Sequence, residues 1–414
     1  MEELVQKQLD CGIELGVVHV PGRHAVAMEL RVLCGMADEP GELLGLARIA
    51  EETISKGTAQ RDGRALSDAF DEIGAAHSSW VGREAMGFTC LCLPEFFERA
   101  LNLHAEFLRT ATFPQDAVQV AVDLARQELH LLEDDAQSLV EKFLARQAFG
   151  TLLGRHPLGE PETVSRVRRD DVVEFWRRFF QAGRMQAAVA GPIEPARVAD
   201  LLDAAFAGFG SSLRAGRTSF PLDFSPRRTH IFKELEQEQI GICFPGVGVR
   251  SPQYPTERVL MGVLSGGMSG RLFTEVREKQ GLVYWVGAWH ENPRDAGMVF
   301  LGASTTPQRA DRTYATLLRE VDRLSDDLMQ DELNRAVTGI VARTETRGDI
   351  TRARCGEMAD DLFHYGRPVP PAEKLSWVRA VTIEHVKRYL LEHPRTQLSV
   401  VTLGPRALEE TSGR

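Results

Sequence analysis

The chain has 414 residues, 43% of them hydrophobic and 26% charged, which is typical of a folded globular protein and excludes a disordered or fibrous one. Its 49 basic and 59 acidic side chains give a formal net charge of −10. This charge argues against a nucleic-acid-binding protein, which usually carries a basic surface. At this length we expect two or three domains, each with a sizeable core.

The chain shows no signal for export or for membrane insertion. Its start, MEELVQKQLDCGIELG, lacks a basic n-region and an apolar h-region. No apolar run approaches the roughly 18–20 residues that a membrane span needs. The six cysteines include no CxxC pair, so we expect buried thiols in a reducing compartment. These features predict the cytoplasm, with no membrane and no nucleic acid as partner.

Alternating and apolar runs predict strands at the start of the chain. Residues 13–20 and 25–33 flank a Pro21-Gly22 turn signal in a hairpin-like pattern. Apolar residues at helical spacing then predict a helix over 43–54, with Gly57 just past its end. The remaining elements expected in the first half are a helix at 65–73, strands within 79–93, helices at 95–109, 114–132, 139–149, 169–180 and 196–207, and a strand at 185–190.

A Gly/Ser/Arg-rich stretch at 208–216, running on to Pro226, predicts a linker. Beyond it the order of elements begins again. Residues 167–175 parallel 381–389, and each stretch leads into a strand that ends in Gly-Pro, at 191–192 and 404–405. The sequence therefore predicts an α+β fold of two homologous α/β sandwich domains, over 1–210 and 229–414, joined by a linker at 211–228.

One long motif, LSGGMSGRLFTEVREKQGLVY, spans residues 264–284. It resembles the Gly-Gly-x-x-Ser-Arg-Leu-Phe … Arg-Glu-Lys-x-Gly-Leu-x-Tyr signature of the insulinase/pitrilysin peptidases (family M16), which include the mitochondrial processing peptidase. The resemblance covers essentially the whole chain, because duplicated α+β halves are also that family's architecture. It implies that Arg277 and Tyr284 bind substrate, the guanidinium at a carbonyl and the phenol at a developing oxyanion. The alternative is that Arg277 pairs with a surface carboxylate and Tyr284 packs.

A second motif, GLARIAEETISKGT at 45–58, resembles the family's Gly-x-Ala-His-x-x-Glu-His … Lys-Gly-Thr, which contains the zinc motif H-x-x-E-H. In active members the two histidines bind zinc and the glutamate is the general base. Here Arg48 and Glu52 stand at the histidine positions and only Glu51 is retained, while Glu128 matches a further acidic ligand. A guanidinium cannot ligate a metal, so no catalytic residue acting alone, no metal and no cofactor are expected on this chain.

Arg48, Glu51 and Glu52 share one helical face, with Ser55 one turn further on. We expect an ion-pair cluster there in place of the metal; the alternative is a merely solvated face. None of the eleven histidines supplies a pair at i, i+3 or i, i+4.

Residues 73–80, IGAAHSSW, resemble the family's Gly-Gly-x-x-Asn-Ala-x-Thr strand, an exposed edge to which an extended peptide adds. Ser78 and Ser79 stand where the family has Asn-Ala. The resemblance therefore implies that Ser78 and Ser79 bind substrate through a strand backbone.

The leading hypothesis is a non-catalytic, substrate-binding subunit of a heterodimeric zinc metallopeptidase. Its partner would be an M16-type chain with an intact H-x-x-E-H that carries the zinc, and its substrate an extended peptide. One alternative is a structural scaffold, like the core subunits of respiratory complexes, that binds no peptide. Another is a stand-alone metallopeptidase with an atypical carboxylate site at Glu51, Glu52 and Glu128, a donor set that suits Mg²⁺, Ca²⁺ or Mn²⁺ better than Zn²⁺.

Overall fold

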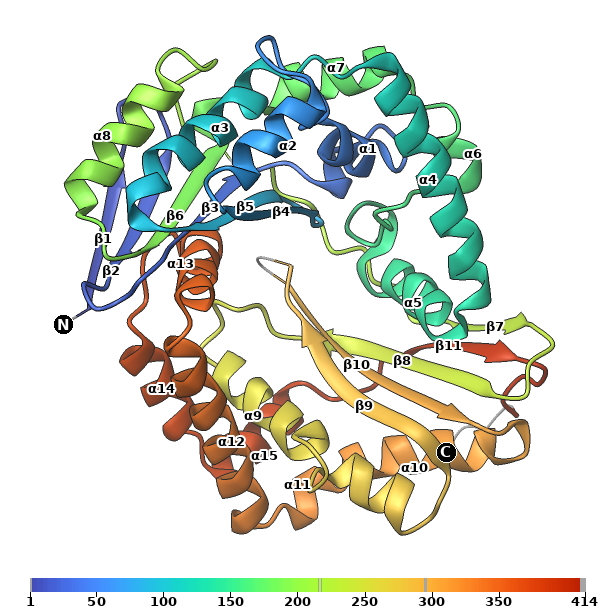
Figure 1. Ribbon diagram of the computed structural model, residues 1–414. Helices are drawn as coiled ribbons and strands as arrows, with labels where there is room; N and C mark the ends of the chain where they lie inside the picture. The colour runs from blue at the N-terminus through green and yellow to red at the C-terminus, as the bar shows by residue number, and fades with distance from the viewer. Residues whose placement is uncertain (1, 215, 217, 294–295, 410–414) are drawn as a thin grey trace. The chain divides into compact units, whose positions relative to one another are not determined.

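The computed structural model describes residues 2–214, 216, 218–293 and 296–409 (Figure 1). Contacts divide the chain into two compact units. Unit 1 comprises Met1–Leu131, Arg155–Phe220 and Thr346–Pro370, and unit 2 comprises Leu132–Gly154, Pro221–Glu345 and Pro371–Arg414.

Unit 1 is built on a six-stranded mixed sheet in the order β1-β2-β6-β3-β5-β4. Its strands are β1 (Glu3–Gln8), β2 (Glu14–His19), β3 (Val26–Val32), β4 (Ala76–Val81), β5 (Met86–Cys92) and β6 (Met185–Gly191). The central strands β3 and β6 are buried along their whole length. Most of their residues are apolar, and the two charged residues of β3, Glu29 and Arg31, form a buried ion pair at 2.6 Å. Strand β4 ends the sheet and is largely exposed.

The sequence predicted a hairpin-like pairing of the strands at residues 13–20 and 25–33, which are β2 and β3 in the structure. This pairing was wrong. Strand β6 lies between β2 and β3, parallel to β2 and antiparallel to β3. In addition β1, which no pattern predicted, pairs with the outer edge of β2. Local alternation and a turn signal predict strands but do not fix which strands pair, since a distant strand can insert between two neighbours.

Unit 2 repeats this topology and confirms the predicted duplication. Its strands are β7 (Arg228–Phe232), β8 (Glu238–Gly246), β9 (Val283–Glu291), β10 (Gly297–Thr305) and β11 (Ser399–Gly404). Their order, β7-β11-β8-β10-β9, matches β2-β6-β3-β5-β4 strand for strand, with the parallel pair in the same place. The free edge β9 therefore corresponds to the free edge β4.

Helices cover the sheets. Those of unit 1 are α1 (Leu46–Thr53), α2 (Gly63–Asp71), α3 (Phe97–Thr110), α4 (Gln115–Asp134, which continues into unit 2), α6 (Pro161–Val164), α7 (Arg169–Phe179), α8 (Pro195–Phe206) and α13 (Thr351–Tyr365). Those of unit 2 are α5 (Ala136–Leu153), α9 (Tyr254–Ser265), α10 (Ala310–Asp322), α11 (Leu324–Asp327), α12 (Gln330–Gly348, which continues into unit 1), α14 (Pro371–Arg379) and α15 (Ile383–Glu392).

Two helices pack on sheets whose strands are distant from them in the sequence. Helix α13 packs on β2, β3 and β6 of unit 1, and α5 packs on β8 and β11 of unit 2 (Figure 1). Small residues allow the close approach: a Cβ added at Gly16 would lie 2.6 Å from the sulfur of Met358 on α13, and one at Gly241 would lie 2.8 Å from Val140 on α5. The contact units therefore differ from the contiguous ranges 1–210 and 229–414 at these two segments.

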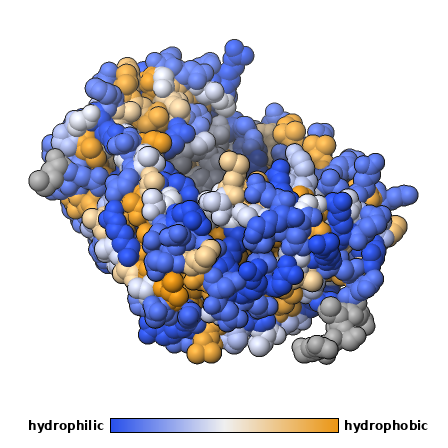
Figure 2. Space-filling model, turned by 90° about the horizontal axis from the view of Figure 1, so that it is seen from below, coloured by the Kyte–Doolittle hydropathy of each residue, from blue (hydrophilic) through white to orange (hydrophobic). Residues whose placement is uncertain are grey.

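The predicted linker 211–228 lies between α8 and β7, where the described residues form no helix or strand before Arg228. All six cysteines are buried free thiols, as expected. On the face shown in Figure 2 hydrophilic residues predominate and apolar ones are scattered. Among the described residues no helix is long and apolar enough to span a membrane.

Candidate functional site

Helix α1 carries the second motif, and its start is fixed by a buried carboxylate. Glu39 accepts hydrogen bonds from the backbone N–H groups of Gly45 (3.2 Å) and Ala47 (2.8 Å). Gly45 has a φ of +97°, a conformation that glycine adopts at little cost. Burial raises the pKa of Glu39 to about 8, although these two hydrogen bonds favour its charged form. With its start fixed in this way, α1 presents Arg48, Glu51 and Glu52 in one register.

Arg48 lies among carboxylates. Its guanidinium donates a hydrogen bond to Glu51 and lies 3.5 Å from the Oε2 atom of Glu52, whose other oxygen is 3.1 Å from the Nζ atom of Lys56. Burial opposes the charge of Arg48, but Glu51, Glu52 and Glu128 outweigh it and raise the pKa of the guanidinium. The side chains therefore form an ion-pair cluster rather than a merely solvated face. We call Arg48, Glu51 and Glu52 the α1 cluster.

Strand β4 runs beside α1 at the free edge of the sheet. Ser79 on β4 donates a hydrogen bond to Glu51, which is only 4% exposed. Ser78, the preceding residue of the strand, points to the other face, where its hydroxyl lies 2.7 Å from that of Thr89. Both predicted serines thus lie on an exposed edge strand, and one of them connects that strand to the α1 cluster.

A tryptophan holds the same edge strand from the opposite face. Trp80 covers Gly87, its partner on β5, so closely that a Cβ at Gly87 would lie 2.2 Å from the indole ring. The guanidinium of Arg31 lies 5.3 Å from the centre of that ring. Side-chain contacts therefore hold strand β4 in place on both of its faces. Its outer edge stays unpaired within the described part of the chain.

The α1 cluster does not fit a zinc ion. A catalytic zinc takes about three neutral or anionic protein ligands, whereas the cation Arg48 occupies the space between two of the candidate carboxylates. The third candidate, Glu128 on α4, is exposed and near enough to act electrostatically on Arg48. The described residues contain no group of three or more His, Cys, Asp or Glu side chains arranged to hold a metal.

In unit 2 the residues of the first motif lie at the other free edge. Tyr284, near the start of β9, is 75% exposed, so it does not pack into the core. Arg277, in the single-turn helix η4 (Phe273–Glu278), places its guanidinium 5.0 Å from the ring centre of Phe273 and 5.6 Å from that of Tyr284. Within the described residues no carboxylate forms an ion pair with Arg277. The phenol and the guanidinium are thus neighbours on an exposed edge.

Arg271, a residue of the same motif to which the sequence assigned no role, anchors the loop before η4. It is buried and forms charge-assisted hydrogen bonds to Glu332 (2.7 Å) and Asp327 (2.6 Å). Its place in the motif is the only signal that could have marked it. Arg271 therefore positions the segment that carries Arg277.

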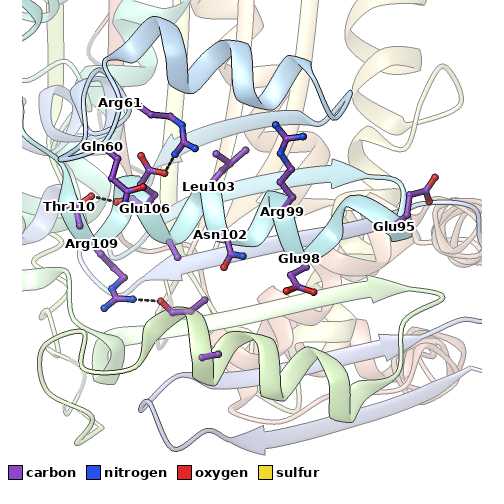
Figure 3. A pocket seen from close by; sticks show the side chains of 13 residues that line it. Gln60, Arg61, Glu95, Glu98, Arg99, Asn102, Leu103, Glu106, Arg109 and Thr110 are labelled. Atoms are coloured by element: carbon purple, nitrogen blue, oxygen red, sulfur yellow. Dashed lines mark hydrogen bonds and ion pairs between the residues drawn. The ribbon is translucent and has the colours of Figure 1, made fainter.

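A pocket of about 830 Å³ lies elsewhere in unit 1, between α3, α8 and the loop at residues 60–61 (Figure 3). Its arginines have partners: Arg61 pairs with Glu106, Arg99 with Glu72, and Arg109 donates to carbonyls at the end of α8. We assign no function to this pocket.

Comparison with known proteins matches the two halves of the chain separately. Residues 17–161 match the sequence model described as Insulinase (Peptidase family M16), and residues 166–340 match the one described as Peptidase M16 inactive domain. An uncharacterized zinc protease of Rickettsia felis is 25% identical over 387 residues, or 92% of each chain. One of Rickettsia bellii is 27% identical over 374 residues, covering 88% of this chain and 89% of its own.

Solved structures share the fold. A peptidase M16 inactive domain from Pseudomonas fluorescens superposes with a TM-score of 0.89 at 18% identity, covering 99% of this chain and 100% of its own. A protease from Helicobacter pylori gives a TM-score of 0.89 at 15% identity, with coverages of 97% and 100%. The two matching sequence models, the duplicated topology and the two motifs agree: the chain belongs to peptidase family M16.

Proposed function

We propose that this protein is the non-catalytic, substrate-binding subunit of a heterodimeric zinc metallopeptidase. The observation that carries the proposal is Arg48, which stands at a histidine position of the zinc motif and forms ion pairs with Glu51 and Glu52. The guanidinium supplies a fixed positive charge to these carboxylates and leaves no room for a metal between them. Zinc and the general base then belong to a partner chain with an intact H-x-x-E-H.

Two free edges support peptide binding. Strand β4 offers an unpaired backbone beside the α1 cluster, and an extended peptide adds to such an edge through main-chain hydrogen bonds. On β9 the exposed hydroxyl of Tyr284 and the guanidinium of Arg277 are donors suited to a substrate carbonyl and to a developing oxyanion. These donors would complete the partner's active site.

The two alternatives receive less support. A scaffold has no use for an exposed phenol beside a guanidinium that has no carboxylate partner among the described residues. A stand-alone carboxylate metal site would require Arg48 to leave Glu51 and Glu52. The name zinc protease carried by the relatives is compatible with this chain being one half of such an enzyme.

The test is reconstitution with an M16 chain of the same organism that retains H-x-x-E-H. We expect the two chains to co-purify as a complex that cleaves unstructured peptides, whereas each chain alone is inactive or nearly so. Cleavage by this chain alone, abolished by a chelator, would instead support the stand-alone alternative. A stable complex whose activity does not depend on this chain would support the scaffold.

A further inference from the structure

We infer that the buried Arg31 is a positioning residue: through Trp80 it holds the free edge strand β4 in the extended conformation that an added peptide requires. The inference rests on the proposed function, since it concerns the edge to which the substrate peptide would add. It assigns a role in peptide binding to a side chain of the central strand β3 that does not itself reach the edge.

Arg31, Gly87 and Trp80 form one row across three neighbouring strands. Gly87 on β5 is the partner of Arg31 on β3 and of Trp80 on β4. Because Gly87 has no side chain, the indole of Trp80 lies across β5, where a Cβ at Gly87 would be only 2.2 Å away. The centre of the indole ring thereby comes to 5.3 Å from the guanidinium carbon of Arg31. A side chain of the edge strand thus crosses its neighbour and reaches a central strand.

The guanidinium of Arg31 is fixed from its other sides. It donates hydrogen bonds to Glu29 (2.6 Å) and to Asp360 on α13 (2.7 Å), and the ring centre of Phe363 on the same helix lies 5.7 Å away. Arg31 and Glu29 are each only 6% exposed. Two carboxylates and two aromatic rings therefore hold the guanidinium in place.

The packing of the sheet does not require an ion pair at this position. An arginine and a carboxylate lose hydration when they are buried, and well-packed apolar residues in their place are often as stabilising or more so. Elsewhere on this face of the sheet apolar residues such as Val18 and Ala27 pack against α13. An apolar side chain at position 31 could not make the cation–π contact with Trp80. That contact with the edge strand accounts for a buried arginine here.

A held edge strand favours the addition of a peptide. If β4 opened locally, it would have to be ordered again before a peptide could pair with it, and this loss of freedom would lower the affinity. Ser79 attaches the strand to Glu51 on the opposite face, so Arg31 and Trp80 provide the second attachment. Since Arg31 acts on binding and not on the chemical step, we expect its loss to raise KM and leave kcat unchanged.

The experiment measures hydrogen exchange of the β4 amides in this chain and cleavage of an internally quenched, unstructured peptide by the reconstituted pair. Two variants detach Trp80 by different routes. Glu29→Gln/Arg31→Met removes the guanidinium without leaving Glu29 as an unpaired charge, and Gly87→Ala puts a Cβ where the indole lies. Each should raise the exchange rates of β4 about tenfold or more. Each should also raise KM about tenfold, with kcat within about twofold of wild type.

The matched control is Arg354→Met on α13. Arg354 is 4% exposed and, like Arg31, pairs with two carboxylates, those of Glu2 and Glu357, neither of which lies on β4. Its loss should lower the thermal unfolding midpoint, because a buried ion pair is broken, but leave β4 exchange and KM within about twofold of wild type.

Three results would overturn the inference. Unchanged β4 exchange in both variants would show that Arg31 does not hold the edge. Exchange that rises equally in all strands of the sheet would show that Arg31 stabilises the whole sheet and does not position β4. Faster exchange confined to β4 with an unchanged KM would refute the role in peptide binding. If the wild-type pair cleaves no peptide, the proposed function fails, whereas the exchange rates still decide whether Arg31 holds β4.

Discussion

Ser79, on the free edge strand β4, donates a hydrogen bond to the carboxylate of Glu51 on helix α1. Glu51 occupies the general-base position of the zinc motif, but here its oxygens accept from Ser79 and from Arg48. The carboxylate is almost fully buried, whereas its donor Ser79 is exposed and Arg48 is half-buried. We expect a carboxylate held in this way to orient the edge strand.

This contact predicts that Ser79→Ala loosens β4. The substitution removes one donor from a buried charged group, which we expect to cost about 1–2 kcal/mol in the local opening of the strand. Hydrogen exchange of the β4 amides measures that opening. Ser78→Ala is the matched control, because its hydroxyl lies on the exposed side with Thr89 and should be worth less than about 0.5 kcal/mol. Equal protection of β4 in both variants would refute the role of Ser79.

The α1 cluster predicts that the purified chain holds no stoichiometric zinc. The double variant Arg48→His/Glu52→His should bind about one zinc per chain, because it restores H-x-x-E-H around Glu51 with Glu128 available as a further ligand. Elemental analysis of the two proteins measures the difference. The single variant Glu52→His, which retains Arg48, is the control and should bind none tightly. Tightly held zinc in the wild-type chain would contradict the account.

Much of the fold could be predicted from the sequence, because Gly-Pro pairs recur at equivalent positions in the two halves of the chain. The Gly-Pro pairs at 191–192 and 404–405 end the equivalent strands β6 and β11, and the topologies agree around them. The insertion of β6 between β2 and β3 could not be predicted, because the pairing of strands so far apart in the sequence leaves no local signal. The sequence analysis also did not predict that α5 packs on the sheet of unit 2 and α13 on the sheet of unit 1. The reason is related, because an apolar helix face does not specify which sheet it covers.

The site was predictable where it depends on helical spacing. Positions i, i+3 and i+4 placed Arg48 beside Glu51 and Glu52 without any knowledge of the fold. The bond from Ser79 to Glu51 could not be foreseen, because it depends on which face of β4 each serine occupies. Register along an edge strand is fixed only by the neighbouring strand.

Buried His104 on α3 predicts a pH-dependent stability of unit 1. Burial lowers its pKa to about 4, although its Nδ1 atom lies 2.8 Å from the carbonyl of Ala100. Between pH 6.5 and 4 the unfolded chain binds a proton that the folded chain excludes, so the free energy of unfolding falls as pH falls. The full loss is about 3 kcal/mol.

The variant His104→Gln isolates this effect, because glutamine does not titrate and can still donate to Ala100. We expect urea unfolding midpoints of wild type and variant to converge as the pH is lowered from 7.5 to 5. Parallel pH profiles for the two proteins would show that His104 makes no such contribution.

The measurement that tests the central claim most directly is the turnover of the reconstituted pair with Tyr284→Phe in this chain. Tyr284 is exposed, so loss of its hydroxyl should leave the fold and the complex intact. A lost oxyanion donor typically lowers turnover about 10²–10³-fold. Arg277→Ala should also weaken substrate binding. The matched control is Tyr314→Phe, which removes a hydroxyl that accepts a hydrogen bond from Arg228 inside unit 2. This control should leave turnover within about twofold. We predict a complex that assembles normally and cleaves at least a hundredfold more slowly with Tyr284→Phe; unchanged cleavage with both Tyr284→Phe and Arg277→Ala would contradict a shared active site.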